Sequence, residues 1–160
     1  MTLPAPPPSA GALTRLVLDT NVVLDWLVFR DPGCDALADA LRGDRVAWVA
    51  TAAMRDELAH VLARGSLDAW RPDVSALWSS WDRWARMVGQ EPTAAPRAPR
   101  CTDPDDQKFI DLALQIGAHA LLSRDRAVQT VQERPIASLA VAVGAGVLLG
   151  YILGSKTNSK

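Results

Sequence analysis

The sequence predicts an α/β fold in which helices cover both faces of a mostly parallel central sheet. Short apolar runs at residues 15–18, 45–50 and 118–122 are typical of buried strands. Stretches in which apolar residues recur at helical spacing separate these runs. Strands that alternate with helices favour a parallel sheet, because each connection between parallel neighbours places a helix against the sheet.

The length and composition indicate one globular domain. The 160 residues can enclose one proper core but are too few for two ordinary domains. With 49% apolar and 22% charged residues, the chain is not of the disordered class. The net charge of -1 excludes a global basic field, so a nucleic acid would need a local positive surface. Candidates for that surface are Arg55, Arg64, Arg97, Arg100, Lys108, Arg124 and Arg126.

Three segments are expected along the chain. Residues 1–14 are rich in proline and are expected to form a stiff, disordered tail without the features of a secretory signal. Residues 15–130 would form the α/β domain, and residues 131–160 a hydrophobic, glycine-rich C-terminal helix. The two cysteines, Cys34 and Cys101, lie at no zinc-ligand spacing and fit a reducing, cytoplasmic setting.

The first half of the chain contains clear helix-start signals. The strand at 15–18 ends in a polar corner, and the apolar residues from 21 to 29 then fit a helix. Asp31 and Pro32 supply an N-cap and a first-turn proline for a second helix, through about residue 41. Thr51, after the strand at 45–50, can cap a third helix over residues 52–64.

A tryptophan-rich helix is predicted after Asp73. Trp81 and Trp84 share one face of it with Leu77 and Val88. A stacking platform for nucleic-acid bases, with Trp70 and Trp78, is one interpretation. We favour a core-facing stripe, because the spacing is helical.

The second half of the chain leads to the last predicted strand. Residues 90–100 form a proline-rich loop, and Asp103 and Pro104 then begin a fifth helix that ends at Gly117. The strand at 118–122 runs into Ser123, Arg124 and Asp125.

Four acidic residues are placed to meet at one edge of this sheet. Asp19 follows the first strand and Asp125 the third, and sites in open parallel sheets form beyond the carboxyl ends of the strands. Glu57 lies in the second turn of the helix after the second strand. Asp106 lies in the first turn of the helix before the third strand. Simpler roles exist: a turn residue for Asp19, a solvated helix residue for Glu57 and a first-turn acid stabilised by the helix dipole for Asp106, while the nearby Asp103 suits an N-cap.

Carboxylates gathered in one cleft repel one another, and a hard divalent cation relieves that repulsion. Oxygen ligands select Mg²⁺ or Mn²⁺. Such an ion activates water and neutralises charge on a phosphodiester. The four acids therefore predict hydrolysis of a nucleic-acid backbone.

Three separated motifs resemble the PIN domain family, nearest to its VapC-like toxins of bacterial toxin–antitoxin pairs. These motifs are LVLDTNVVLDWL, TAAMRDELAHVL and CTDPDDQKFIDLALQIGAHALLSRD, and the resemblance covers residues 16–128. It implies an αβα sandwich and an Mg²⁺- or Mn²⁺-dependent endoribonuclease that cleaves RNA. It also implies a homodimer and a partner antitoxin.

The resemblance assigns roles to individual residues. Its four metal-binding and catalytic acids fall on Asp19 in DTN, Glu57 in RDEL, Asp106 and Asp125 in SRD. Supporting groups that orient these carboxylates are Asn21 and Ser123, with Asp103 as an accessory acid.

The end of the chain departs from the family pattern. Residues 136–154 carry no charged side chain and, as a helix, would span roughly 28 Å, close to the hydrocarbon thickness of a bilayer. Gly146, Gly150 and Gly154 recur every four residues, which is typical of close-packing membrane helices. The segment resembles glycine-rich anchors of small bacterial inner-membrane proteins that associate with ribosomes, so tethering of a cytoplasmic domain to the inner membrane is expected. The alternatives are a segment that folds back as the missing strand and helix of the core, and a fused or frameshifted gene.

Two other functions compete with the ribonuclease. The first is a non-enzymatic, degenerate PIN module that binds an antitoxin, RNA or the ribosome. The second is phosphoryl transfer through an aspartate nucleophile. That chemistry needs another aspartate two residues after the first, where this chain has Asn21, so it ranks last.

Overall fold

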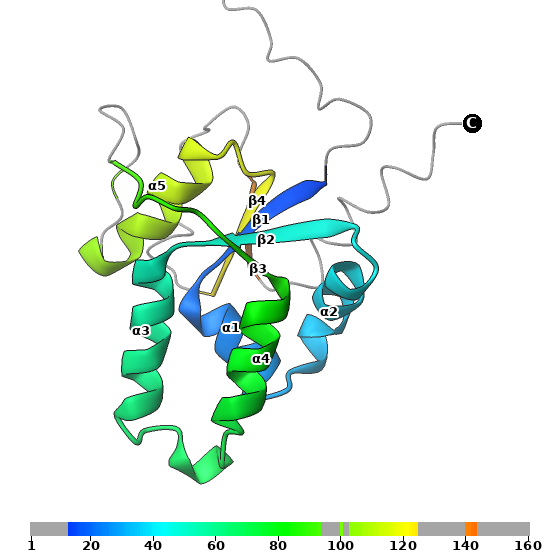
Figure 1. The fold of residues 1–160 in the computed structure, drawn as a ribbon, viewed down its shortest axis with the longest axis vertical. Helices are drawn as coiled ribbons and strands as arrows, with labels where there is room; N and C mark the ends of the chain where they lie inside the picture. Colours follow the sequence, from blue (N-terminus) through cyan, green and yellow to red (C-terminus); the bar gives the residue numbers. More distant parts are fainter. Residues whose placement is uncertain (1–12, 94–99, 101–102, 125–139, 144–160) are drawn as a thin grey trace, which may run out of the picture.

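A computed structural model describes residues 13–93, 100, 103–124 and 140–143, and it shows a five-stranded parallel sheet (Figure 1). The strand order is β3-β2-β1-β4-β5, and every neighbouring pair is parallel. The strands are β1 (Thr14–Leu18), β2 (Val46–Ala50), β3 (Ala85–Met87), β4 (Ala120–Ser123) and β5 (Ala140–Val143). The helices are α1 (Thr20–Leu27), α2 (Asp35–Arg42), α3 (Ala52–Ala63), α4 (Val74–Trp84) and α5 (Gln107–Gln115). Short 3₁₀ turns are η1 (Pro32–Cys34), η2 (Asp68–Trp70) and η3 (Pro104–Asp106).

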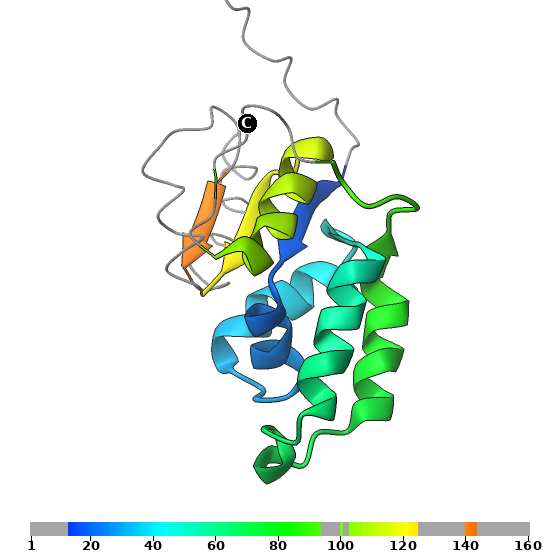
Figure 2. The ribbon, with the colours of Figure 1, turned by 90° about the vertical axis from the view of Figure 1, so that its left-hand side faces the viewer.

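Helices cover both faces of the sheet, so the predicted αβα arrangement is confirmed. α5 packs on one face, over β1 and β4, and α2 packs on the opposite face (Figures 1 and 2). α3 and α4 lie side by side and extend past the sheet, joined through η2 at their far end (Figure 2). An ion pair between Arg55 and Asp82, 3.1 Å long, links these two helices.

Side-chain caps mark the helix starts; those at Thr51 and Asp73 were predicted and are confirmed, whereas the cap at Asp19 was not predicted. The Asp19 side chain accepts a hydrogen bond at the start of α1, and the Thr51 and Asp73 side chains do the same for α3 and α4. Asp31 and Asp103 cap the 3₁₀ turns that lead into α2 and α5. These side chains satisfy amide N–H groups that have no partner inside a helix.

The tryptophans of α4 face the core, as the helical spacing predicts. Trp81 is buried and packs edge-on against Trp48 of β2, with 4.7 Å between the ring centroids. Trp84 is half-buried and packs against Trp26 of α1 at 5.5 Å. Most of the rings that a stacking platform would use therefore pack in or against the core, and of these tryptophans only Trp70 is extensively exposed.

The helix predicted to reach Val88 ends earlier. α4 stops at Trp84, and β3 follows without a break and pairs with β2, from Trp48↔Ala85 to Ala50↔Met87. Helical spacing of apolar residues cannot reveal this change, because backbone pairing with the edge of β2 decides it.

At residues 140–143 the expected C-terminal helix is corrected to a strand. β5 pairs in parallel with β4, in the register Ala120↔Ala140 to Ser123↔Val143. The sequence AVAV suits a strand because valine is β-branched, and pairing satisfies the otherwise open edge of β4. A search of the described residues finds no helix long and apolar enough to cross a membrane. Residues 1–12, and the rest of the predicted anchor at 136–154, lie outside the described part.

Candidate active site

Asp19 occupies the carboxyl end of β1 and is 2% exposed. Its Oδ1 atom accepts a hydrogen bond of 3.0 Å from the N–H group of Val22, and its Oδ2 atom accepts one from the hydroxyl of Ser123. The Asp19 N–H group donates to the carbonyl oxygen of Leu122 at 3.0 Å. β1 and β4 are neighbours with Leu18 level with Leu122, so their carboxyl ends bring Asp19 and Ser123 together.

Glu57 lies in the second turn of α3 and joins the same region through two contacts. The Thr20 hydroxyl donates to its Oε2 atom, and the Lys108 ammonium group donates to its Oε1 atom at 3.0 Å. Thr20 directly follows Asp19 in the chain. The two acids are therefore brought together by consecutive residues at the start of α1.

Asp106 stands where η3 passes into α5. Its Oδ2 atom is buried, and the side chain does not cap the helix. The Lys108 ammonium group also donates to the carbonyl oxygen of Asp105, at 2.5 Å. Lys108 thus ties the segment that carries Asp106 to Glu57 on α3.

The remaining candidate residues are not part of this hydrogen-bond network in the described structure. Asp103 is exposed and accepts a hydrogen bond from the N–H group of Asp105 at 2.9 Å, which is a capping role. Asn21 is exposed at the start of α1 and makes no hydrogen bond to any of the described carboxylates. Asp125 lies outside the described residues. Its neighbour Arg124 forms a 2.6 Å ion pair with Asp25, whose side chain is almost completely buried.

Several members of this hydrogen-bond and ion-pair network were not predicted from the sequence. Lys108 and Arg124 were named only as positive charges for a nucleic acid, whereas both are paired with carboxylates of the fold. Thr20 and Asp25 were not singled out. The position of Thr20 inside DTN was the available signal, because a hydroxyl next to the first acid can orient another carboxylate.

The chemical type of these side chains suits a hard divalent cation, but the arrangement of those that the structure describes does not yet form a metal site. Carboxylate oxygens are the preferred ligands of Mg²⁺ and Mn²⁺. Among the residues that the structure describes, however, no group of three acidic, histidine or cysteine side chains is arranged to hold a metal ion. Hydrogen bonds from Thr20 and Lys108 occupy both oxygens of Glu57. Each of these oxygens keeps a second lone pair, so metal coordination by Glu57 would have to compete with the positive charge of Lys108 more than with a filled acceptor.

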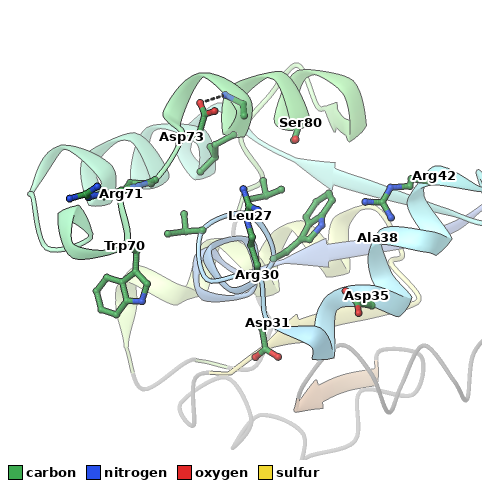
Figure 3. A pocket seen from close by; sticks show the side chains of 15 residues that line it. Leu27, Arg30, Asp31, Asp35, Ala38, Arg42, Trp70, Arg71, Asp73 and Ser80 are labelled. Carbon is green, nitrogen blue, oxygen red and sulfur yellow. Dashed lines mark hydrogen bonds between the residues drawn. The ribbon is translucent and has the colours of Figure 1, made fainter.

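A pocket of about 520 Å³ lies at the far end of α1 (Figure 3). Its lining includes Trp26, Leu27, Arg30, Arg42 and Trp70, but none of the predicted acids that the structure describes. The Arg30 backbone is left-handed, with φ of 53°, which is uncommon for a residue other than glycine. This pocket is therefore separate from the carboxylate region.

Comparisons with known proteins agree with the geometry at the family level. A family model described as "PIN domain" matches residues 15–127. Comparisons with curated proteins and with solved structures give no match. PIN domains share a nuclease-type fold and are generally nucleases that use divalent metal ions, which supports a hydrolase of phosphodiester bonds. On the match over most of its length, and on the parallel sheet with acids at its carboxyl edge, the chain belongs to the PIN domain family.

Proposed function

We propose that the protein is a divalent-metal-dependent endoribonuclease and the toxin component of a toxin–antitoxin pair. One observation carries the nuclease proposal. The consecutive residues Asp19 and Thr20 connect β1 to β4 through Ser123, and to α3 through Glu57. Both acids are thus held at the start of α1, next to the edge where open parallel sheets hold their ligands.

The residues proposed to hold Mg²⁺ or Mn²⁺ are Asp19, Glu57, Asp106 and Asp125. When bound, the ion would lower the pKa of a water molecule and neutralise charge on the scissile phosphodiester. Ser123 and Thr20 orient the carboxylates of Asp19 and Glu57 through their hydroxyl groups.

The substrate class and the partners are also proposals. RNA as substrate, a protein antitoxin and a homodimer rest on the likeness of the three motifs to VapC-like toxins. We infer a cytoplasmic site of action on the same basis.

The test is RNA cleavage by the full chain with and without Mn²⁺. The full chain is needed because β5 pairs with β4. Asp19→Asn and Asp106→Asn remove one carboxylate charge each, and Asp39→Asn, at an exposed position of α2, is the matched control. Loss of a metal ligand should reduce cleavage by about 100-fold or more, since loss of an outer partner alone costs 10–100-fold. Metal-independent cleavage, or equal activity in all three variants, would exclude the proposal.

A binding module without turnover is the second candidate. It is favoured by the described carboxylates, which are arranged around Thr20, Ser123 and Lys108 and not around a metal position. Fluorescence anisotropy with labelled RNA separates the two functions. Binding of intact RNA in Mn²⁺, without cleavage over hours, would favour the module.

A further inference from the structure

Lys108 occupies a place where a helix disfavours a positive charge. It lies in the first turn of α5, next to the positive end of the helix dipole. Acidic residues stabilise such a turn and cations destabilise it. Asp105 and Asp106 obey this preference and Lys108 does not. A compensating interaction must therefore hold the lysine there.

Glu57 supplies that interaction. The Lys108 Nζ atom lies 3.0 Å from the Glu57 Oε1 atom and 2.5 Å from the carbonyl oxygen of Asp105. The two charged side chains are 24% and 27% exposed, so water screens their attraction less than it screens a surface pair. The other Glu57 oxygen accepts from Thr20, which fixes the orientation of the carboxylate.

We propose that Lys108 is a built-in counter-ion of the carboxylate site, which releases Glu57 when a divalent cation binds. The inference rests on the proposed metal-dependent function. In the metal-free protein the ammonium group balances carboxylate charge that otherwise destabilises the fold. On metal binding, the ammonium group and the metal ion would face the same carboxylate, and repulsion between these positive charges would favour departure of the ammonium group. Lys108 therefore lowers the affinity for the metal and raises the stability of the metal-free protein.

The substitution Lys108→Gln separates the effect of the positive charge from the effect of the hydrogen bond to Glu57. Glutamine keeps a hydrogen-bond donor for Glu57 but removes the positive charge. Lys108→Arg keeps the charge. Arg42→Gln is the matched control, because it also removes one positive charge and one ion pair, with Asp39 on the exposed face of α2.

The experiment is Mn²⁺ binding to the full-length proteins, measured by calorimetry and by the loss of the free-Mn²⁺ electron paramagnetic resonance signal. We expect Lys108→Gln to bind Mn²⁺ on the order of tenfold more tightly than the parent chain. Lys108→Arg and Arg42→Gln should bind as the parent does. A thermal melt should show a lower Tm for metal-free Lys108→Gln and a larger rise in Tm on addition of Mn²⁺ than in the parent.

The outcomes distinguish this inference from the proposed function. Mn²⁺ binding by the parent, with equal or weaker binding by Lys108→Gln, would overturn the role of Lys108 and leave the metal-dependent function intact. Absence of Mn²⁺ binding in every protein would overturn both. Binding that first becomes measurable in Lys108→Gln would support the counter-ion, since the lysine alone would then have suppressed it.

Discussion

The hydroxyl of Ser123 donates a hydrogen bond to the Oδ2 atom of Asp19, although 104 positions separate the two residues in the sequence. Both side chains are buried, and they come from the carboxyl ends of the neighbouring strands β1 and β4. A carboxylate inside a protein is costly unless hydrogen bonds replace its lost hydration. The contact therefore both stabilises the fold and fixes the direction of the first acid of the candidate site.

Ser123→Ala should lower the free energy of unfolding by about 1–3 kcal/mol, because it removes a hydrogen bond to a buried charged group. Urea unfolding followed by circular dichroism measures this change. Ser79→Ala is the matched control, since its hydroxyl only donates to a backbone carbonyl oxygen on the exposed face of α4. Equal effects of the two substitutions would show that the contact with Asp19 contributes nothing.

Trp81→Ala should destabilise the protein by about 3–5 kcal/mol, since this ring is 3% exposed and packs against Trp48. Trp70→Ala should cost about 1 kcal/mol or less, since that ring is 56% exposed and, among the described aromatic rings, packs edge-on against Phe29 alone. Trp81→Phe should cost less than Trp81→Ala, because it keeps a ring and removes a buried indole N–H with no hydrogen-bond partner in the described part. Thermal and urea unfolding test this order.

The same two alanine variants test the stacking platform. If the tryptophans serve the core, Trp70→Ala should leave RNA affinity within about twofold of the parent. If Trp70→Ala instead lowers the RNA affinity tenfold or more without a change in stability, the exposed Trp70 ring stacks on RNA bases.

A chain that ends after residue 134 should be less stable than the full chain, because it lacks β5. The four residues of β4 are completely or almost completely buried, and removal of β5 opens their edge. At about 1 kcal/mol for each backbone hydrogen bond, the loss should amount to a few kcal/mol, with increased aggregation. A chain that ends after residue 146 retains β5 and is the control. Identical melting and light scattering of the two truncated chains would show that β5 adds nothing to the sheet.

The Cys34 thiol should be nearly inert at neutral pH. Burial raises its pKa from 9.0 to about 11, and the Asp25 and Asp31 carboxylates act in the same direction. The unfolded chain then loses its thiol proton at a lower pH than the folded protein. The corresponding stability is present below pH 9 and is lost as the pH rises towards 11, by roughly 2 kcal/mol.

Iodoacetamide modification in a Cys101→Ser background measures this pKa through the pH dependence of the rate. Urea unfolding between pH 8 and about 11 should show the loss of stability, and Cys34→Ala should lack that component. A thiol that reacts at pH 8 as rapidly as a free cysteine would refute the prediction.

Much of the fold followed from local sequence patterns. The caps at Thr51 and Asp73, and the apolar runs of three strands, are visible because capping and burial depend on residues close in the chain. β3 was not predicted, and a last strand in the C-terminal segment was only an alternative to the predicted helix. The backbones of β3 and β5 are decided by the open edges of β2 and β4, which exist only once the sheet has formed.

The same division applies to the candidate site. The motifs alone predict Asp19, Glu57 and Asp106 as site acids and identify the family, because they are local and occur in a fixed order. The partners of these acids are seen first in the folded protein: Ser123 for Asp19, and Thr20 with Lys108 for Glu57. The reason is that hydrogen bonds and ion pairs depend on ångström-scale distances between elements far apart in the chain, and the register of β1 against β4 and the packing of α3 beside α1 set those distances.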